Sequence, residues 1–181
     1  KGNVMTDHTF DHAFEAAFRG SRDEIKTRLS FYGRILTPLL KAGVPATALD
    51  LGCGRGEWLE VLADAGIEAR GVDLDDGMLA DCRAAGLDVE NKDLLTALEE
   101  AEAGSLGFVS AFHLFEHLPF DTQHEAIRRA LAALAPGGVL IVETPNPENI
   151  EVSTVTFHND ATHISPIPPG VLEIAARHEG F

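Results

Sequence analysis

One short stretch, A-T-A-L-D-L-G-C-G-R-G at residues 46–56, constrains the fold of this chain more than any other. The apolar side chains of Ala48, Leu49 and Leu51 are typical of a strand buried in a parallel sheet. Three glycines follow, where the backbone can turn sharply and a ligand can approach the main chain. Residues 57–65 then have helical spacing, and the first turn of such a helix offers free N–H groups to a polar ligand.

An acidic residue follows at the distance expected for a nucleoside-binding site. Residues 68–73 (E-A-R-G-V-D) indicate a second strand that ends in Asp73, 21 positions after Gly52. The carboxyl ends of neighbouring parallel strands meet at one edge of a sheet, so this carboxylate can accept hydrogen bonds from both hydroxyls of a ribose beside the loop. The alternative is a tight strand-to-helix turn that binds nothing.

The segments L-D-L-G-C-G-R-G and V-D-L-D together resemble class I S-adenosylmethionine-dependent methyltransferases. The third glycine comes two residues after the second, unlike the G-x-G-x-x-G of nicotinamide dehydrogenases. The resemblance implies S-adenosylmethionine as cofactor, S-adenosylhomocysteine as product, and an acid before the loop, Asp50, that orients the methionine end. It also implies cofactor contacts in the loop and after three further strands: Gly52, Cys53, Gly54, Asp73, Leu74, Met78, Asp93, Leu94, Phe112 and His113. For Asp93, an N-cap role is the alternative.

The alternation of strand and helix patterns predicts the fold class. We expect an α/β, Rossmann-like, doubly wound and mostly parallel sheet with helices on both faces. Strands are predicted to end at Leu51, Asp73, Asn91, Phe112 and Glu143, with helices over 57–65, 76–85, 93–103, 119–134 and 169–179. Residues 144–169 hold five prolines and are predicted as a long loop. The last antiparallel strand pair of class I methyltransferases is missing, which predicts a fragment of a longer chain with possible partner domains.

Residues 1–45 are predicted to form an N-terminal helical cap, and residues 46–181 the methyltransferase core. Aromatic residues at helical spacing predict a first helix over 10–18. A capping-box pattern, Ser21 followed by Glu24, predicts a second helix that runs to about Ala42 and is kinked at Pro38. The inner face of this second helix is expected to carry Ile25, Leu29, Ile35 and Leu39.

The charge balance argues against nucleic acid as a partner. The chain has 14 Lys and Arg against 29 Asp and Glu, a net charge of −15, whereas phosphate binding needs a basic face. Two cysteines provide no disulfide framework, so we expect a cytoplasmic location. The sequence has no apolar run long enough to predict a transmembrane segment. The expected partner is a small-molecule or glycan acceptor.

Three motifs narrow the resemblance. R-G-S-R at 19–22, E-T-P-N-P-E-N at 143–149 and D-A-T-H at 160–163 resemble bacterial methyltransferases that modify cell-surface polysaccharides, including O-antigen chains. The resemblance implies that Arg22 binds the cofactor carboxylate; the alternative is a solvated arginine at a helix start. Asp160 and His163 are predicted to serve as an acid–imidazole pair that takes the proton of a sugar hydroxyl. His117 joins them as a catalytic candidate, with a packed histidine at a strand end as its alternative.

Several other functions remain open. His113-x-x-Glu116-His117 matches a zinc protease pattern, but that pattern needs a helix and Pro119 follows closely, so we predict no metal. Metal binding by His158, Asp160 and His163 is a further alternative. A nicotinamide-dependent sugar oxidoreductase is disfavoured, because Tyr32 has no lysine four residues on. A non-catalytic cofactor-binding module is also an alternative to the predicted O-methylation of a sugar or glycan by direct methyl displacement.

Overall fold

The computed structural model describes residues 20–181, and the predicted helix over 10–18 lies outside them. Five parallel strands form one sheet in the order β3-β2-β1-β4-β5. The strands are β1 (Thr47–Leu51), β2 (Glu68–Asp73), β3 (Asp88–Asn91), β4 (Leu106–Phe112) and β5 (Leu134–Glu143). The predicted α/β, doubly wound fold is therefore confirmed, and the strand order reverses at β1, between β2 and β4.

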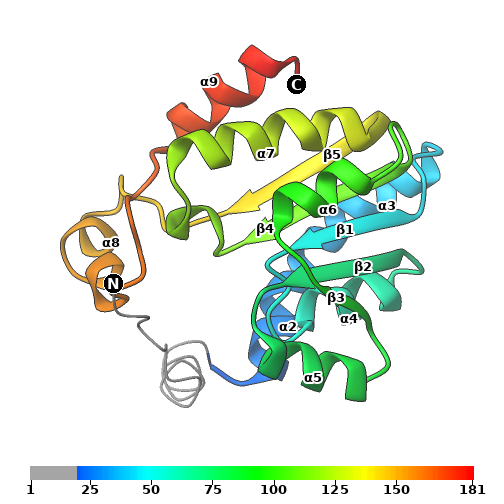
Figure 1. Cartoon of the computed structure of the whole chain (residues 1–181), viewed down its shortest axis with the longest axis horizontal. Helices are drawn as coiled ribbons and strands as arrows, with labels where there is room; N and C mark the ends of the chain where they lie inside the picture. Colours follow the sequence, from blue (N-terminus) through cyan, green and yellow to red (C-terminus); the bar gives the residue numbers. More distant parts are fainter. Residues whose placement is uncertain (1–19) are drawn as a thin grey trace.

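Helices cover both faces of the sheet (Figure 1). One layer consists of α2 (Arg22–Leu29), α3 (Gly33–Lys41), α4 (Glu57–Asp64) and α5 (Asp76–Ala84). The other consists of α6 (Leu94–Glu100), α7 (Phe120–Ala133) and α9 (Pro169–Glu179). Each layer buries its own apolar cluster against the sheet, with Trp58 and Phe108 in the first and Phe115 and Val109 in the second.

Side-chain caps set the starts of several helices. Ser21 and Glu24 form the predicted capping box at α2, Asp75 accepts hydrogen bonds from the N–H groups of Gly77 and Met78 at α5, and Asp93 caps α6. Because α6 already ends at Glu100, the prediction of a helix to residue 103 is too long. Among the described helices, none is long and apolar enough to span a bilayer.

The predicted helix from Ser21 to Ala42 is wrong in its middle. A 3₁₀ turn, η1 (Ser30–Tyr32), separates α2 from α3, and Pro38 lies inside α3. The tighter turn rotates the following residues relative to a continuous α-helix. As a result Leu36 is fully buried, whereas Ile35, predicted to face inward, is 38% exposed. Tyr32 reaches the core side and packs edge-on against Trp58 and Phe112.

The segment predicted as an unstructured loop contains short helical pieces. A helix, α8 (Ile150–Thr154), and a 3₁₀ turn, η3 (Thr156–Asn159), interrupt residues 144–168. Asn149 caps α8 through hydrogen bonds to the N–H groups of Glu151 and Val152. Phe157 is buried there, and Ile164 donates its N–H to the carbonyl of Glu116 over 2.8 Å. These contacts hold the segment against the end of β4.

Candidate cofactor and acceptor site

The glycine loop after β1 has the conformation that its sequence requires. Gly52, Gly54 and Gly56 all have positive φ angles, of 67°, 52° and 78°. The N–H groups of Gly52 and Cys53 donate to the carbonyl of Val72, over 2.8 and 3.0 Å, and so hold the loop across the end of β2. Left-handed backbone favours glycine, which explains the spacing of the three glycines.

Asp73 lies at the tip of β2, beside this loop. One carboxylate oxygen accepts the N–H of Gly54 and the other accepts the N–H of Asp75, each over 2.9 Å. The side chain is half-buried, and within residues 20–181 no ion pair involves it. This is the position from which a carboxylate can bind the hydroxyls of a ribose, as the sequence predicts.

Asp50 lies one strand end away, in a buried network. It is 2% exposed and accepts the Ser110 hydroxyl over 2.7 Å, while that hydroxyl accepts the indole N–H of Trp58 over 2.9 Å. Burial raises the pKa of the Asp50 carboxyl to about 7. The network joins β1, β4 and α4 directly under the loop.

A recess of about 50 Å³ opens above Asp50. The arginine that lines this recess is not the one that the sequence predicts. The recess is lined by Arg28 of α2, together with loop residues and with Phe112 and His113 of β4. Arg22, the predicted partner of the cofactor carboxylate, instead donates to the carbonyl of Arg55 over 2.8 Å and to Glu60 over 2.6 Å. Arg28 could have been found from its place on the same helix face as Ile25 and Leu29.

The predicted adenine contacts, Asp93 and Leu94, follow β3, and the further predicted cofactor contacts Leu74 and Met78 follow β2. Asp93 is exposed and accepts the N–H groups of Leu95 and Thr96, each over 3.0 Å, so its N-cap role is present. Leu94 is half-buried beside it. Leu74 is 69% exposed and Met78 is buried. The structure thus brings an exposed leucine and a capping acid to one edge of the sheet.

His113 follows β4 in a strained conformation, with φ at 52°. Its Nδ1 lies 3.4 Å from Glu116 and its Nε2 lies 3.3 Å from Glu143. Glu143 also accepts the Tyr32 hydroxyl over 2.6 Å. Hydrogen bonding to Glu116 and Glu143 raises the pKa of His113 to about 9, so its imidazole is charged at neutral pH.

The three predicted catalytic residues lie together, although His117 is more than 40 positions from Asp160 and His163 in the sequence. The rings of His117 and His163 have centroids 4.8 Å apart, and His163 Nε2 lies 3.7 Å from Asp160. Thr162, which the sequence reasoning missed, connects them: its hydroxyl donates to Asp160 over 2.6 Å and lies 2.9 Å from His117 Nδ1. Burial lowers the pKa of His117, so this imidazole is neutral at pH 7.

The same region also offers metal-binding atoms. Glu116, His117 and His163 each offer one possible ligand atom, and these three atoms lie within 4.8 Å of one another. The H-x-x-E-H pattern does not lie on an α-helix, which agrees with the expectation from the nearby Pro119. Its residues Phe115–His117 form a 3₁₀ turn, η2. His158, from the alternative metal set, lies 3.2 Å from the carbonyl of Ser153.

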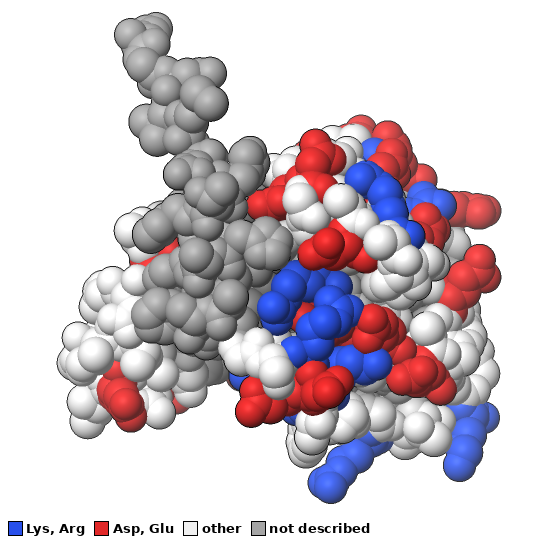
Figure 2. All heavy atoms as spheres, turned by 90° about the horizontal axis from the view of Figure 1, so that it is seen from below, with Lys and Arg blue, Asp and Glu red and all other residues white. Residues whose placement is uncertain are grey.

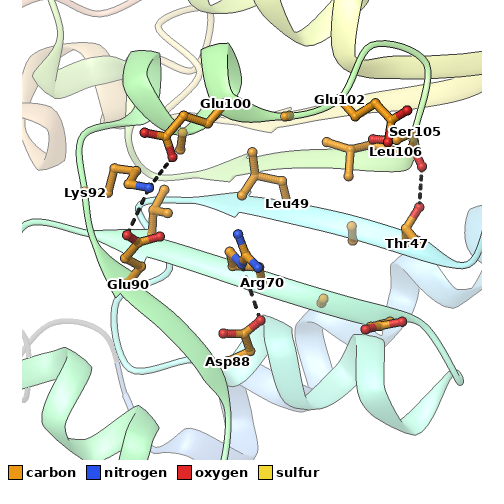
Figure 3. A pocket seen from close by; sticks show the side chains of 16 residues that line it. Thr47, Leu49, Arg70, Asp88, Glu90, Lys92, Glu100, Glu102, Ser105 and Leu106 are labelled. Atoms are coloured by element: carbon orange, nitrogen blue, oxygen red, sulfur yellow. Dashed lines mark hydrogen bonds and ion pairs between the residues drawn. The ribbon is translucent and has the colours of Figure 1, made fainter.

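A second recess, of about 280 Å³, is lined by residues of β1–β3, of α6 and of the segment that follows α6 (Figure 3). Its charged side chains pair with one another, since Lys92 lies between Glu90 and Glu100 and Arg70 lies 3.3 Å from Asp88. Charges that are paired with one another indicate a solvated surface rather than a ligand site.

Comparisons with known proteins agree with this geometry. The family described as "Methyltransferase domain" matches residues 24–181. A ubiquinone biosynthesis O-methyltransferase of Hydrogenovibrio crunogenus is 30% identical over 150 residues, which cover 75% of this chain and 61% of that protein. A trans-aconitate 2-methyltransferase of Rhizobium meliloti is 35% identical over 137 residues, covering 73% of this chain and 49% of that one. The chain thus spans about half the length of these curated relatives.

Among solved structures, a SAM-dependent methyltransferase from Archaeoglobus fulgidus superposes with a TM-score of 0.82. It is 31% identical, and the match covers 95% of this chain and 74% of that one. The curated relatives named above are not polysaccharide methyltransferases, so the comparisons support the predicted class and leave the narrower resemblance to O-antigen enzymes as a prediction.

Proposed function

The chain belongs to the family of S-adenosylmethionine-dependent methyltransferase domains, and from this we propose that the protein methylates a hydroxyl oxygen of a small-molecule or glycan acceptor. The observation that carries this proposal is the Asp73 carboxylate, which lies beside the glycine loop with both oxygens on backbone N–H groups. A relative named as an O-methyltransferase supports oxygen as the atom that is methylated.

The residues present fit the cofactor. Gly71 has no Cβ under the loop, where a Cβ would lie 2.7 Å from Cys53, and the small recess beyond Gly52 is bordered by Asp50 and Arg28. We assign the ribose to Asp73, the adenine end to the tips of β2 and β3, and the methionine carboxylate to Arg28 of α2. When bound, S-adenosylmethionine would supply an electrophilic methyl group for attack by the acceptor oxygen, with S-adenosylhomocysteine as the leaving group.

The chain's own contribution is to hold the acceptor and take up its proton. Because the Thr162 hydroxyl donates to Asp160, its oxygen is left to accept the Nδ1–H of His117. His163 donates its own Nδ1–H to the carbonyl of Phe157 over 2.7 Å. With the ring nitrogens assigned in this way, Nε2 is the nitrogen of each imidazole that is left to accept the proton of a hydroxyl group, and at His163 this nitrogen lies 3.7 Å from the Asp160 carboxylate. We assign this role to the His117–His163 pair, with Asp160 as its positioning residue.

For the acceptor class we favour a sugar or glycan. The support is the resemblance of R-G-S-R, E-T-P-N-P-E-N and D-A-T-H to O-antigen-type methyltransferases, two of which border the residues placed here at the acceptor end. The two curated relatives carry the names of different acceptors, which shows that this fold hosts several substrates. A phenolic acceptor, suggested by the ubiquinone enzyme, is the second candidate.

The proposal is tested first by binding. S-adenosylhomocysteine should raise the thermal midpoint of unfolding, because a ligand that binds the folded state stabilises it, and NAD should not. Methyl transfer is then screened with nucleotide sugars, lipid-linked glycans and phenols. His163→Ala and His117→Ala should lower turnover while leaving the shift with S-adenosylhomocysteine unchanged. Binding without transfer to any acceptor would favour the non-catalytic module, and no shift would refute the cofactor assignment.

A further inference from the structure

A second cluster of histidine and glutamate side chains lies between α7 and α9. His124 comes from α7, and His178 and Glu179 come from the last turn of α9. One ligand atom from each of the three lies within 4.8 Å of the others. Figure 1 shows α9 lying along α7, so residues 54 and 55 positions apart meet on one surface. The proposed methyl-transfer chemistry uses none of them.

The local contacts orient this cluster. His124 Nε2 lies 2.7 Å from Glu179 Oε1, and the rings of His124 and His178 have centroids 5.9 Å apart. The Phe120 ring lies parallel to the His124 ring, with an interplanar angle of 8° and 6.2 Å between the ring centroids. The Glu179 side chain is only 15% exposed, so its carboxylate is held close to the helix pair, whereas His178 is exposed and can turn.

We propose that a zinc ion binds here, on one nitrogen each of His124 and His178 and an oxygen of Glu179, with water as its fourth ligand. Two imidazoles and a carboxylate are a donor set that zinc takes in tetrahedral sites with one open position. Ligand atoms about 2.0–2.1 Å from zinc lie about 3.3 Å apart in a tetrahedron. The His124–Glu179 pair must therefore open by a few tenths of an ångström, and the exposed His178 must approach.

Zinc at this position would tie α9 to α7. Residues 144–168, which carry Asp160, Thr162 and His163, run between β5 and α9. Fixing α9 thus fixes one end of the segment that we assign to the acceptor. The proposed zinc ligands are separate from the residues assigned to the cofactor and the acceptor, so the test of this site does not depend on the proposed methyl transfer.

The test is a titration of the full chain, without an affinity tag, with zinc chloride in a calorimeter. We expect one zinc per chain with a micromolar dissociation constant, and a rise in the thermal midpoint that EDTA reverses. His124→Ala and His178→Ala should each weaken binding at least tenfold, and Glu179→Gln should weaken it several-fold. His178 is exposed, so its replacement should not disturb folding. With Co²⁺ in place of zinc, the visible absorption should be lost in the same variants.

Three controls locate the ion. His158→Ala replaces an exposed histidine outside the cluster and should leave the zinc affinity unchanged, as should a His8→Ala/His12→Ala double variant. His163→Ala removes a ligand of the Glu116–His117–His163 group and should also leave it unchanged. The proposal is overturned if the wild-type chain binds no zinc, if His124→Ala and His178→Ala bind zinc as the wild type does, or if one of the controls abolishes binding.

Discussion

At the scale of single residues, Asp73 is the side chain on which cofactor binding most depends. Its carboxylate accepts two backbone N–H groups and faces the glycine loop. We expect Asp73→Ala to weaken S-adenosylhomocysteine binding at least tenfold, because a hydrogen bond to a charged group contributes about 1.5–3 kcal/mol. Calorimetric titration measures this loss. Asp88→Ala, which removes an exposed acid from β3, is the matched control, and equal affinities for both variants would contradict the ribose assignment.

His113 gives the protein a pH dependence with a definite sign. Its pKa is raised to about 9 by Glu116 and Glu143, above the roughly 6.5 of an unfolded histidine. A raised folded-state pKa stabilises the protein fully below pH 6.5, and this stabilisation is lost as the pH rises through 9. We expect the free energy of unfolding to fall over this window in the wild type and to fall less in His113→Gln.

Denaturant unfolding at several pH values checks this prediction. Asp50 titrates near pH 7 and loses its own contribution between about pH 4 and 7, and this loss is common to both proteins. The comparison is therefore made between pH 7 and 9. Parallel curves for wild type and His113→Gln in that interval would show that the imidazole is not held by the two carboxylates.

Sequence patterns predict the cofactor residues more directly than the acceptor residues. Gly52, Gly54 and Asp73 follow a fixed spacing, because a left-handed loop and a strand tip impose it. The grouping of His117 with Asp160 and His163 depends on how residues 144–168 return to β4, which no local pattern encodes. Thr162 could not be predicted for the same reason, and Arg28 lies outside R-G-S-R, the motif that carries Arg22.

At the scale of elements, the fit between the glycine loop and β2 depends on Gly71. A Cβ at this position would lie 2.7 Å from the Cβ and Sγ of Cys53 and from Leu59 Cδ1. Since Cys53 Cβ is fixed to the loop backbone, the loop would have to move. We expect Gly71→Ala to lower the free energy of unfolding by about 1–3 kcal/mol and to weaken cofactor binding.

The matched control for this element is Gly33→Ala. Gly33 begins α3, and nothing lies within 4 Å of the Cβ that alanine would add. Alanine favours helix, so this variant should be as stable as the wild type or more stable by up to about 1 kcal/mol. Chemical denaturation measures both variants. A Gly71→Ala protein that is as stable as Gly33→Ala would mean that the loop tolerates displacement.

Element ends show what a pattern of local residues can and cannot predict. β4 at Leu106–Phe112 and α9 at Pro169–Glu179 have the predicted bounds, since a buried strand and a proline at a helix start are local signals. The break at Ser30–Tyr32 is a tertiary effect. It lets Tyr32 reach both Glu143 and the Trp58–Phe112 pair, and helix propensity contains no information about those partners.

At the scale of the whole molecule, the net charge of −15 sets the response to salt. Figure 2 shows lysine and arginine side chains gathered near the middle of one face, with acidic side chains around them. The chain has 29 Asp and Glu but only 14 Lys and Arg, so more than half of the acidic residues cannot each have a separate basic partner. Uncompensated like charges repel one another more in the compact state than in the expanded unfolded chain.

We therefore expect the thermal midpoint to rise as NaCl increases from about 0.02 to about 0.3 M, because the screening length falls from roughly 20 to roughly 6 Å. Salt also weakens favourable surface pairs such as Arg177–Glu173 and Arg70–Asp88, but each contributes only about 0–1 kcal/mol. The repulsion is long-ranged and unpaired, so its relief should exceed that loss. Choline chloride should act like NaCl if screening is the cause, and a midpoint that falls with salt would show that the ion pairs outweigh the net charge.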